Sequence, residues 1–384
     1  MNNIFKIFFI LFFTFYSFNS FGNTPGEKIK IGLLVPMTGD NKKLGDLIIK
    51  STRMALEDIN IKDIEIYPKD TAINPSQTLK SAKQLKNIGV KIFIGPVFFK
   101  SLTYLEEVED VIFLSLTNQT LNLPKNVISS GINATSQLNT IKKFLESNEI
   151  KKTIFLTPKL NYENEVKKAI KQSKIKIYKH YSYDTEPTKL TKQIEEITNY
   201  RIRKQNLVDE MKRVENSDLI DKEEQIKKLE KRYTIGNVNF DSVIISDFDE
   251  SLKSVVTSFL YTDVSPKNKY IITFNQWFNK SIQNESSIQP IFYPSINNKN
   301  LKNFEKKFFK KFEEYPNHLS LLGYDLVGLI YYLSVENIIN DIDKLFKKKS
   351  SFKGKIGIFE IKDNKINHIL NFYKVEDGKI KEIF

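Results

Sequence analysis

Short apolar runs alternate along the chain with longer segments in which apolar residues recur every three or four positions. The run IKIGLLV at 29–35 has the length of a buried strand. Leu44, Ile48, Ala55 and Ile59 then recur at a spacing that places them on one face of a helix. The beginning of the chain therefore predicts a strand followed by an amphipathic helix.

The same alternation continues through most of the sequence. Asn74, Pro75 and Gln77 form a helix start, with an N-cap, a proline at the first helical position and a capping-box glutamine. One further helix should end near Leu145 and another should begin at Tyr162. Runs of strand length lie at 64–67, 90–94, 111–116, 127–129, 153–156, 175–183, 243–245 and 270–273. Strands and helices in alternation predict parallel sheets covered by helices on both faces.

The pattern restarts near residue 133, and the chain is longer than one comfortable core. We therefore expect an α/β fold of two doubly wound parallel-sheet lobes joined by crossover strands. Lobe I is expected to comprise 28–130 and 290–347. Lobe II is expected to comprise 131–289 and 351–384.

The segment 199–234 departs from this rhythm. Residues 200–232 contain ten Lys or Arg and eight Asp or Glu. Two sparse apolar stripes are present, formed by Leu207, Met211 and Val214 and by Ile226, Leu229 and Tyr233. We expect a charged helical hairpin inserted in lobe II, which is either a solvated flap or a docking surface.

The first 22 residues have the features of an export signal. A single lysine, Lys6, precedes the apolar run at 7–16, and small residues stand at Ser20 and Gly22, where a signal peptidase reads. The run is short for a membrane span. We expect a signal peptide over 1–22 that is cleaved after Gly22, with an uncleaved anchor helix as the alternative.

Composition narrows the possible chemistry. The chain has no cysteine, which excludes disulfides, thiolate catalysis, zinc–thiolate sites and a lipid anchor on an N-terminal cysteine. His180, His318 and His368 lie in separate segments without metal-ligand spacing, and we expect each on the surface. Neither a G-x-S-x-G elbow nor a glycine-rich phosphate loop is present. We therefore expect no enzyme, no catalytic residues, no metal and no cofactor.

The formal net charge of +13 does not alter these expectations of fold and function. Basic residues are mostly interleaved with acidic ones, which is typical of solvated faces. A functional alternative is attraction to an anionic cell-wall polymer or an acidic partner. Nucleic acid is not expected as a partner of an exported chain.

Several segments together resemble the type I periplasmic binding proteins, the Leu/Ile/Val-binding class. They are IKIGLLVPMTGDNKKLG, Asp70 ahead of NPSQTLKSAKQL, VKIFIGPVFFKS, LGYDLVGLIYYL, and SSFKGKIGIFEI followed by VEDGKIKEI. The resemblance extends from about Lys28 to the end. It implies a non-enzymatic, soluble periplasmic protein that binds a ligand between two lobes.

Three segments resemble the penicillin-binding protein activator branch of that class. They are the end of the insert with 235–241, the turn at 274–277, and LSLTNQT at 114–120. This resemblance implies a regulator of cell-wall synthesis with a penicillin-binding protein as partner. Well-known activators are lipoproteins with an additional helical domain, and the lack of cysteine departs from that pattern. The alternative is the solute-binding component of an ABC transporter for branched-chain or related amino acids, with a permease as partner.

Candidate ligand-binding residues stand in the loops that follow the predicted strands, because the carboxyl ends of parallel strands face the crevice. Ser101 and Thr117 are candidates for binding the carboxylate of an amino-acid ligand, and either Asp247 or Asp249 is a candidate for its ammonium group. Ser101, Thr117 and Asp247 are equally suited to capping helices. Tyr162 resembles the tyrosine with which the family's second lobe covers a ligand. The remaining candidates are Thr38, Pro96, Phe98, Asn118, Asn275 and Trp277, of which the aromatic residues either stack on a ligand or fill the cleft.

Overall fold

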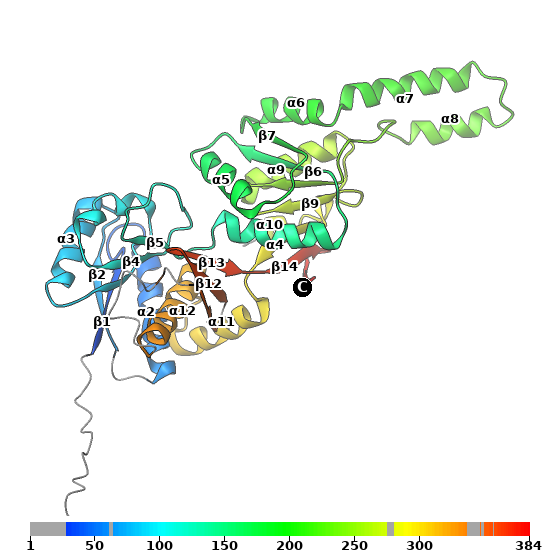
Figure 1. Cartoon of the computed structure of the whole chain (residues 1–384). Coiled ribbons are helices and arrows are strands. Elements are labelled where there is room, and N and C mark those ends of the chain that lie inside the picture. The colour runs from blue at the N-terminus through cyan, green and yellow to red at the C-terminus, as the bar shows by residue number, and fades with distance from the viewer. Residues whose placement is uncertain (1–27, 61–63, 275–279, 336–345, 347–348, 356) are drawn as a thin grey trace, which may run out of the picture.

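The computed structural model describes residues 28–384 except 61–63, 275–279, 336–345, 347–348 and 356 (Figure 1). The expected signal peptide at 1–22 lies outside the described residues. None of the described helices is both long and apolar enough to cross a membrane.

The first sheet is built from the amino-terminal strands, all of them parallel. Its order is β2-β1-β3-β4-β5, so the chain winds outward from β1 in both directions. The strands are β1 (Ile29–Val35), β2 (Ile64–Asp70), β3 (Ile92–Ile94), β4 (Ile112–Ser115) and β5 (Val127–Ser129). The helices of this part are α2 (Lys42–Ile59), α3 (Pro75–Lys86), η1 (Phe99–Leu102) and η2 (Leu105–Glu107). The strand predictions in this part of the chain are confirmed.

Of the two hydrogen bonds that a capping box would place at the start of α3, the one accepted by the Asn74 side chain is present. The side-chain oxygen of Asn74 accepts a hydrogen bond from the backbone N–H of Gln77 at 3.0 Å. The Gln77 side chain donates to Ser81 (3.4 Å), which lies along the same helix. The N-cap prediction is therefore confirmed, and the glutamine supports the first turns of the helix.

The second sheet follows the order β15-β14-β10-β9-β8-β6-β7. Strands β6 to β10 run parallel, β14 runs antiparallel to β10, and β15 runs antiparallel to β14. Its strands are β6 (Thr153–Pro158), β7 (Lys179–Tyr183), β8 (Ser242–Ile245), β9 (Tyr270–Thr273), β10 (Ile291–Ser295), β14 (Asn371–Glu376) and β15 (Lys379–Glu382). Its helices are α4 (Ala134–Ser147), α5 (Glu163–Ser173), α6 (Pro187–Ile197), α9 (Asp249–Tyr261) and α10 (Lys280–Gln283), with the short η3 (Ser286–Ile288). The strand predicted over 175–183 begins only at Lys179.

A small antiparallel sheet, β11-β12-β13, completes the first lobe. Its strands are β11 (Ser350–Lys353), β12 (Ile358–Lys362) and β13 (Lys365–Ile369). Phe359, Ile361 and Ile366 alternate with exposed residues and pack into the core of the first lobe. The helices α11 (Asn298–Phe312) and α12 (His318–Val335) contribute to the same core.

The strand positions differ in two places from the expected lobe boundaries. The strand β10, expected with 290–347 in lobe I, is hydrogen-bonded between β9 and β14 of the second sheet. The sheet β11-β12-β13, expected with 351–384 in lobe II, packs on the first lobe because its apolar face covers that core. Only β14 and β15 of the carboxyl-terminal segment join the second sheet.

The chain passes between the lobes three times, after β5, after β10 and after β13. The first passage is held by His368, whose ring Nε2 lies 2.7 Å from the carbonyl oxygen of Ser130. The second is held by Tyr373, whose hydroxyl donates to the carbonyl of Ile296 (3.1 Å) and accepts from the backbone N–H of Asn298 (2.9 Å). Residues of β13 and β14 therefore hold the first two connecting segments between the lobes in place.

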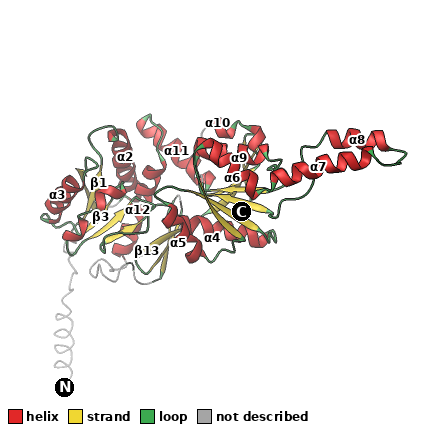
Figure 2. Cartoon of the chain, turned by 90° about the horizontal axis from the view of Figure 1, so that it is seen from above, coloured by secondary structure: helices red, strands yellow, loops and turns green. Residues whose placement is uncertain are grey.

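The predicted charged hairpin is present as α7 (Tyr200–Glu215) and α8 (Lys222–Glu230). We call 200–233 the arm, because it extends from the second lobe away from the rest of the molecule (Figures 1 and 2). Leu207 and Val214 of α7 are buried, whereas α8 has no buried residue.

A buried arginine fixes the base of the arm. The guanidinium of Arg203 donates to the carbonyls of Gly236 (3.1 Å) and Thr262 (3.0 Å) and to the hydroxyl of Thr234 (2.7 Å). Arg203 is only 7% exposed. Planar donors of this kind hold several acceptors in one geometry, so the arm has a defined origin on lobe II.

Candidate functional site

A pocket of about 450 Å³ lies where the two lobes and the small sheet meet. The loops after β3 and β4 supply Phe98 and Thr117, and lobe II supplies Phe248 and Phe274 after β8 and β9. These positions follow the carboxyl ends of parallel strands, as the fold predicts for a ligand site. The rest of the described lining includes residues of α12 and of β12 and β13 in the small sheet.

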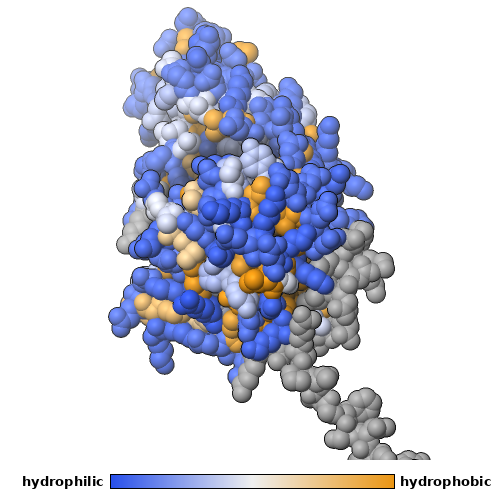
Figure 3. All heavy atoms as spheres, turned by 90° about the vertical axis from the view of Figure 1, so that its left-hand side faces the viewer, coloured by the Kyte–Doolittle hydropathy of each residue, from blue (hydrophilic) through white to orange (hydrophobic). Residues whose placement is uncertain are grey.

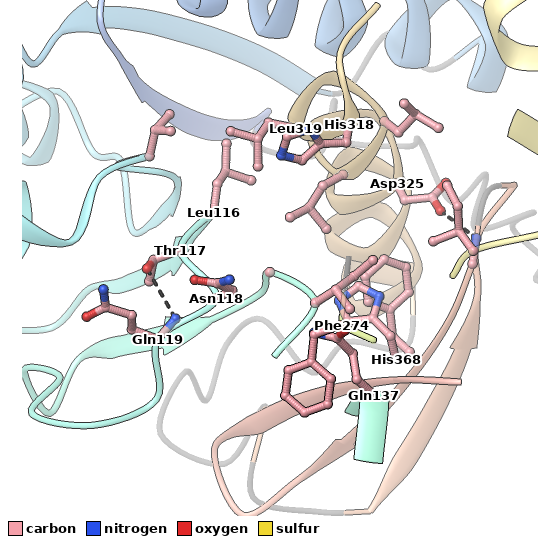
Figure 4. Close-up of a pocket in the computed structure, with 18 of the residues that line it drawn as sticks. Leu116, Thr117, Asn118, Gln119, Gln137, Phe274, His318, Leu319, Asp325 and His368 are labelled. Atoms are coloured by element: carbon pink, nitrogen blue, oxygen red, sulfur yellow. Dashed lines mark hydrogen bonds between the residues drawn. The ribbon is translucent and has the colours of Figure 1, made fainter. Parts of the chain in front are cut away.

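Three of the predicted site residues line this pocket: Phe98, Thr117 and Asn118. The Thr117 hydroxyl accepts a hydrogen bond from the backbone N–H of Gln119 at 3.3 Å (Figure 4). This bond turns the loop after β4, in which Asn118 faces the pocket. These residues form the lobe I side of the candidate site.

The other predicted residues of lobe I lie outside the pocket. The hydroxyl of Thr38 donates to Asp70 (2.6 Å), and the carbonyl of Pro96 accepts from the hydroxyl of Ser115 (2.8 Å). Ser101 is 1% exposed, and its hydroxyl has no partner among the described residues. Thr38, Pro96 and Ser101 are not among the described residues that line the pocket.

The predicted lobe II residues are engaged within their own lobe rather than in the pocket. Asp247 is 5% exposed and accepts from the Tyr183 hydroxyl (2.5 Å) and from the backbone N–H of Phe248 (2.9 Å). Burial raises the pKa of Asp247, although both hydrogen bonds act in the opposite direction. The Tyr162 hydroxyl donates to the carbonyl of Ser246 at 2.9 Å. Both groups already have hydrogen-bond partners inside lobe II.

Two predicted site residues, Asn275 and Trp277, lie outside the described residues. Their neighbour Phe274 is described and lines the pocket, with its ring packed edge-on against Phe155.

Several lining residues were not predicted from the sequence. Gln137 comes from α4, His318 and Asp325 come from α12, and His368 comes from β13 of the small sheet (Figure 4). Phe359 comes from β12 of the same sheet. The lone aspartate in the otherwise apolar segment LGYDLVGLIYYL was the one available signal, since a buried acid needs a partner. Its partners are backbone N–H groups of Lys355 (2.9 Å) and Gly357 (3.1 Å).

The expectation that all three histidines lie on the surface is wrong for His368. This residue is 6% exposed, with its ring centroid 4.8 Å from that of Phe359. Burial lowers the pKa of His368 to about 4, so the ring is neutral near pH 7. The sequence could not reveal this burial, because β13 reaches the pocket only after the chain has crossed both lobes.

A polar contact joins the lobes beside the pocket, and we call it the latch. Glu165 of α5 accepts from the backbone N–H and hydroxyl of Thr120 (3.0 and 2.5 Å) and from the backbone N–H of Leu121 (3.0 Å). Lys168 donates to the carbonyl of Thr120 at 3.1 Å. The loop after β4 in lobe I is thereby held against a helix of lobe II.

Among the described residues, no three His, Asp or Glu side chains are arranged to hold a metal ion. The described lining of the pocket offers apolar walls, side-chain amide groups and the hydroxyl of Thr117, which are suited to binding.

Comparison with known proteins agrees with this geometry. Residues 28–201 match the family model described as periplasmic binding protein, which is less than half of the chain. The sequence has no significant match among curated proteins.

Solved structures are similar over nearly the whole chain. The C-domain of LpoA from Haemophilus influenzae, described as a regulator of PBP1A, has a TM-score of 0.63 and 16% identity, with 92% of this chain and 100% of that chain covered. In full-length LpoA the match spans 59% of that protein. An ABC transporter substrate-binding protein from Desulfitobacterium hafniense in complex with Leu has a TM-score of 0.60 and 13% identity, covering 93% and 100%.

A branched-chain amino acid substrate-binding protein, LivJ from Streptococcus pneumoniae in complex with isoleucine, has a TM-score of 0.53 and 17% identity, covering 92% of this chain and 98% of that one. At such identities the likeness concerns the fold. The resemblance to type I periplasmic binding proteins and the two-lobed α/β fold class are thereby confirmed. These structural neighbours are binding proteins or regulators.

Proposed function

Starting from the fold of a type I periplasmic binding protein, we propose that this chain is a non-enzymatic periplasmic regulator of cell-wall synthesis. It acts by binding a penicillin-binding protein, as an activator-like protein. The observation that carries the proposal is the arm, which extends from lobe II and contributes none of the described residues that line the pocket or form the hydrophobic cores of the lobes (Figure 2). The similarity to the LpoA domain supports the same class of partner.

The arm exposes apolar side chains that a solvated flap does not require. Ile202 and Tyr233 are 63% and 76% exposed, and Ile220 at the tip is fully exposed. Exposed apolar side chains also occur on lobe I, such as Ile88 and Tyr104, and Figure 3 shows groups of apolar residues among hydrophilic ones on that face, but the three arm residues are more exposed than either. Exposed apolar residues rimmed by charges are typical of protein-interaction sites.

The experiment is a binding titration between the purified protein and a penicillin-binding protein. Replacing Ile202, Ile220 and Tyr233 by serine should weaken binding by about tenfold or more, because interface energy is concentrated in a few buried apolar residues. The matched control replaces two exposed apolar residues of lobe I, Ile88 and Tyr104, by serine. Equal affinity of the arm variant and the wild type would count against the arm as docking site, and no binding by the wild type would count against the function.

The pocket favours a second candidate function, the solute-binding component of an ABC transporter for branched-chain or related amino acids. A volume of about 450 Å³ between two lobes is within the range of small-molecule sites. A thermal-denaturation panel of amino acids and small amides tests this function. A ligand present at a hundred times its dissociation constant should stabilise the protein by about 2.7 kcal/mol. A panel without any shift would count against transport.

Export by a cleaved signal peptide belongs to the same proposal. The apolar run at 7–16 and the small residues Ser20 and Gly22 support it. Amino-terminal sequencing of protein recovered from the periplasm should begin at Asn23. A protein that stays in the membrane fraction with Met1 intact would show that the segment is an anchor.

A further inference from the structure

The described walls of the pocket are mostly apolar and aromatic. Phe98, Phe248 and Phe274 face it from the loops of the two lobes, and Phe359 closes it from the small sheet. Aliphatic residues of α12, among them Leu322, line the remaining side. Such a surface favours a ligand that removes apolar area from water.

The described lining contains no lysine or arginine, and its one carboxylate is already engaged. Asp325 is 3% exposed and accepts backbone N–H groups from Lys355 and Gly357. Desolvation holds the pKa of both lining histidines, His318 and His368, below the usual value, so both rings are neutral near pH 7. A ligand with an unpaired charge would therefore be desolvated here without a compensating partner, which is costly.

One buried polar group in the pocket has no partner among the described residues. Gln137 is 4% exposed, and its side-chain oxygen makes no hydrogen bond within that part of the chain. Its amide lies in the pocket beside Phe274 and His368 (Figure 4). A buried amide oxygen without a donor is unfavourable, and a donor brought by a ligand would satisfy it.

We propose that the inter-lobe pocket binds an uncharged ligand with an apolar body, one polar group of which donates a hydrogen bond to the side-chain oxygen of Gln137. The proposal rests on the second candidate function and names the ligand class for it. It departs from a free amino acid, because neither acid expected to bind an ammonium group, Asp247 or Asp249, is among the described residues that line the pocket, and Asp247 accepts a hydrogen bond from Tyr183. Neutral amides and alcohols with an aliphatic or aromatic body fit this chemistry.

A matched pair of probes tests the ligand class on the full-length protein. Leucine and N-acetyl-leucine amide carry the same side chain, but only leucine is a zwitterion. Titration followed by thermal denaturation should show that the blocked amide raises the melting temperature and that leucine does not. Saturable binding of leucine with equal or higher affinity would overturn the ligand class while supporting the solute-binding function.

The role of Gln137 is tested by Gln137→Met, which keeps the shape and removes the hydrogen-bonding atoms. Without ligand this variant should be at least as stable as the wild type, because an unpartnered buried group is lost. Its affinity for N-acetyl-leucine amide should fall about three- to tenfold, the effect of one neutral hydrogen bond. Gln205→Met on the arm is the control and should bind as the wild type does.

Unchanged affinity of Gln137→Met for the blocked amide would overturn the assignment of Gln137. Absence of binding by both probes would overturn the ligand class, and the broader panel of amino acids then decides the solute-binding function separately. The penicillin-binding protein titration is independent of either result.

Discussion

Replacing Glu165 by alanine should open the cleft between the lobes, because this side chain makes three of the four hydrogen bonds of the latch. Its carboxylate accepts three hydrogen bonds from Thr120 and Leu121 across the lobe boundary. The alanine variant leaves Lys168 in place and keeps α5 helical, since alanine is the strongest helix former. The expected change is therefore in the balance between closed and open forms.

The size of the effect follows from the contacts. Hydrogen bonds to a charged acceptor contribute about 1.5 to 3 kcal/mol each when buried, and less where water competes. Glu165 is half-buried, so we assign about 3 kcal/mol to the three bonds together. A loss of that size shifts the ratio of closed to open molecules by roughly a hundredfold, which converts a predominantly closed population into a mixed or open one.

Small-angle X-ray scattering provides the measurement. The wild type should have the radius of gyration of the closed form, and Glu165→Ala should have a larger one. Glu163→Ala is the matched control, because Glu163 lies on the same helix but binds Ser182 and Lys167, both in lobe II. If Glu165→Ala and Glu163→Ala scatter alike, the latch does not govern closure and our reasoning from these contacts is wrong.

Three further predictions follow from single residues. The pKa of His368 is about 4 in the folded protein and 6.5 in the free side chain, so the unfolded state binds the proton first as the pH falls. The free energy of unfolding should therefore decrease by about 3 kcal/mol between pH 6.5 and pH 4. Urea unfolding of His368→Gln at both pH values should show a smaller decrease. Arg203→Met should destabilise the base of the arm by about 3 kcal/mol and speed hydrogen exchange there, while Arg213→Met, which loses only an exposed pair with Glu210, should exchange as the wild type does. Gly354→Ala should lower the melting temperature, because a Cβ there would lie 2.3 Å from an Asp325 oxygen.

Most of the fold could be predicted from the sequence, because buried parallel strands are continuous apolar runs. The segment 29–35 and the Asn74 cap are local features, and local physics decides them. The placement of β10 was not predictable in this way. In the sheet, β10 pairs with β9 on one side and with β14 on the other. Because β14 lies far along the chain, no local sequence pattern shows that it is the partner of β10.

The residues of the candidate site likewise fall into those that local sequence patterns predict and those that depend on distant parts of the chain. Phe98, Thr117 and Asn118 line the pocket because they follow strands whose ends face it. Gln137 and His368 come from elements whose arrival at the pocket depends on the three crossovers. The choice of Asp247 as a ligand-binding acid did not foresee Tyr183, a partner 64 residues away that occupies its carboxylate.

The central claim is that this two-lobed protein acts by binding a partner through the arm. Hydrogen–deuterium exchange of the full-length protein, with and without a purified penicillin-binding protein, tests it most directly. Amides of 200–233 should become protected in the complex while the first sheet exchanges as before. A complex in which the arm exchanges at its free rate, with protection confined to other surfaces, would contradict the account.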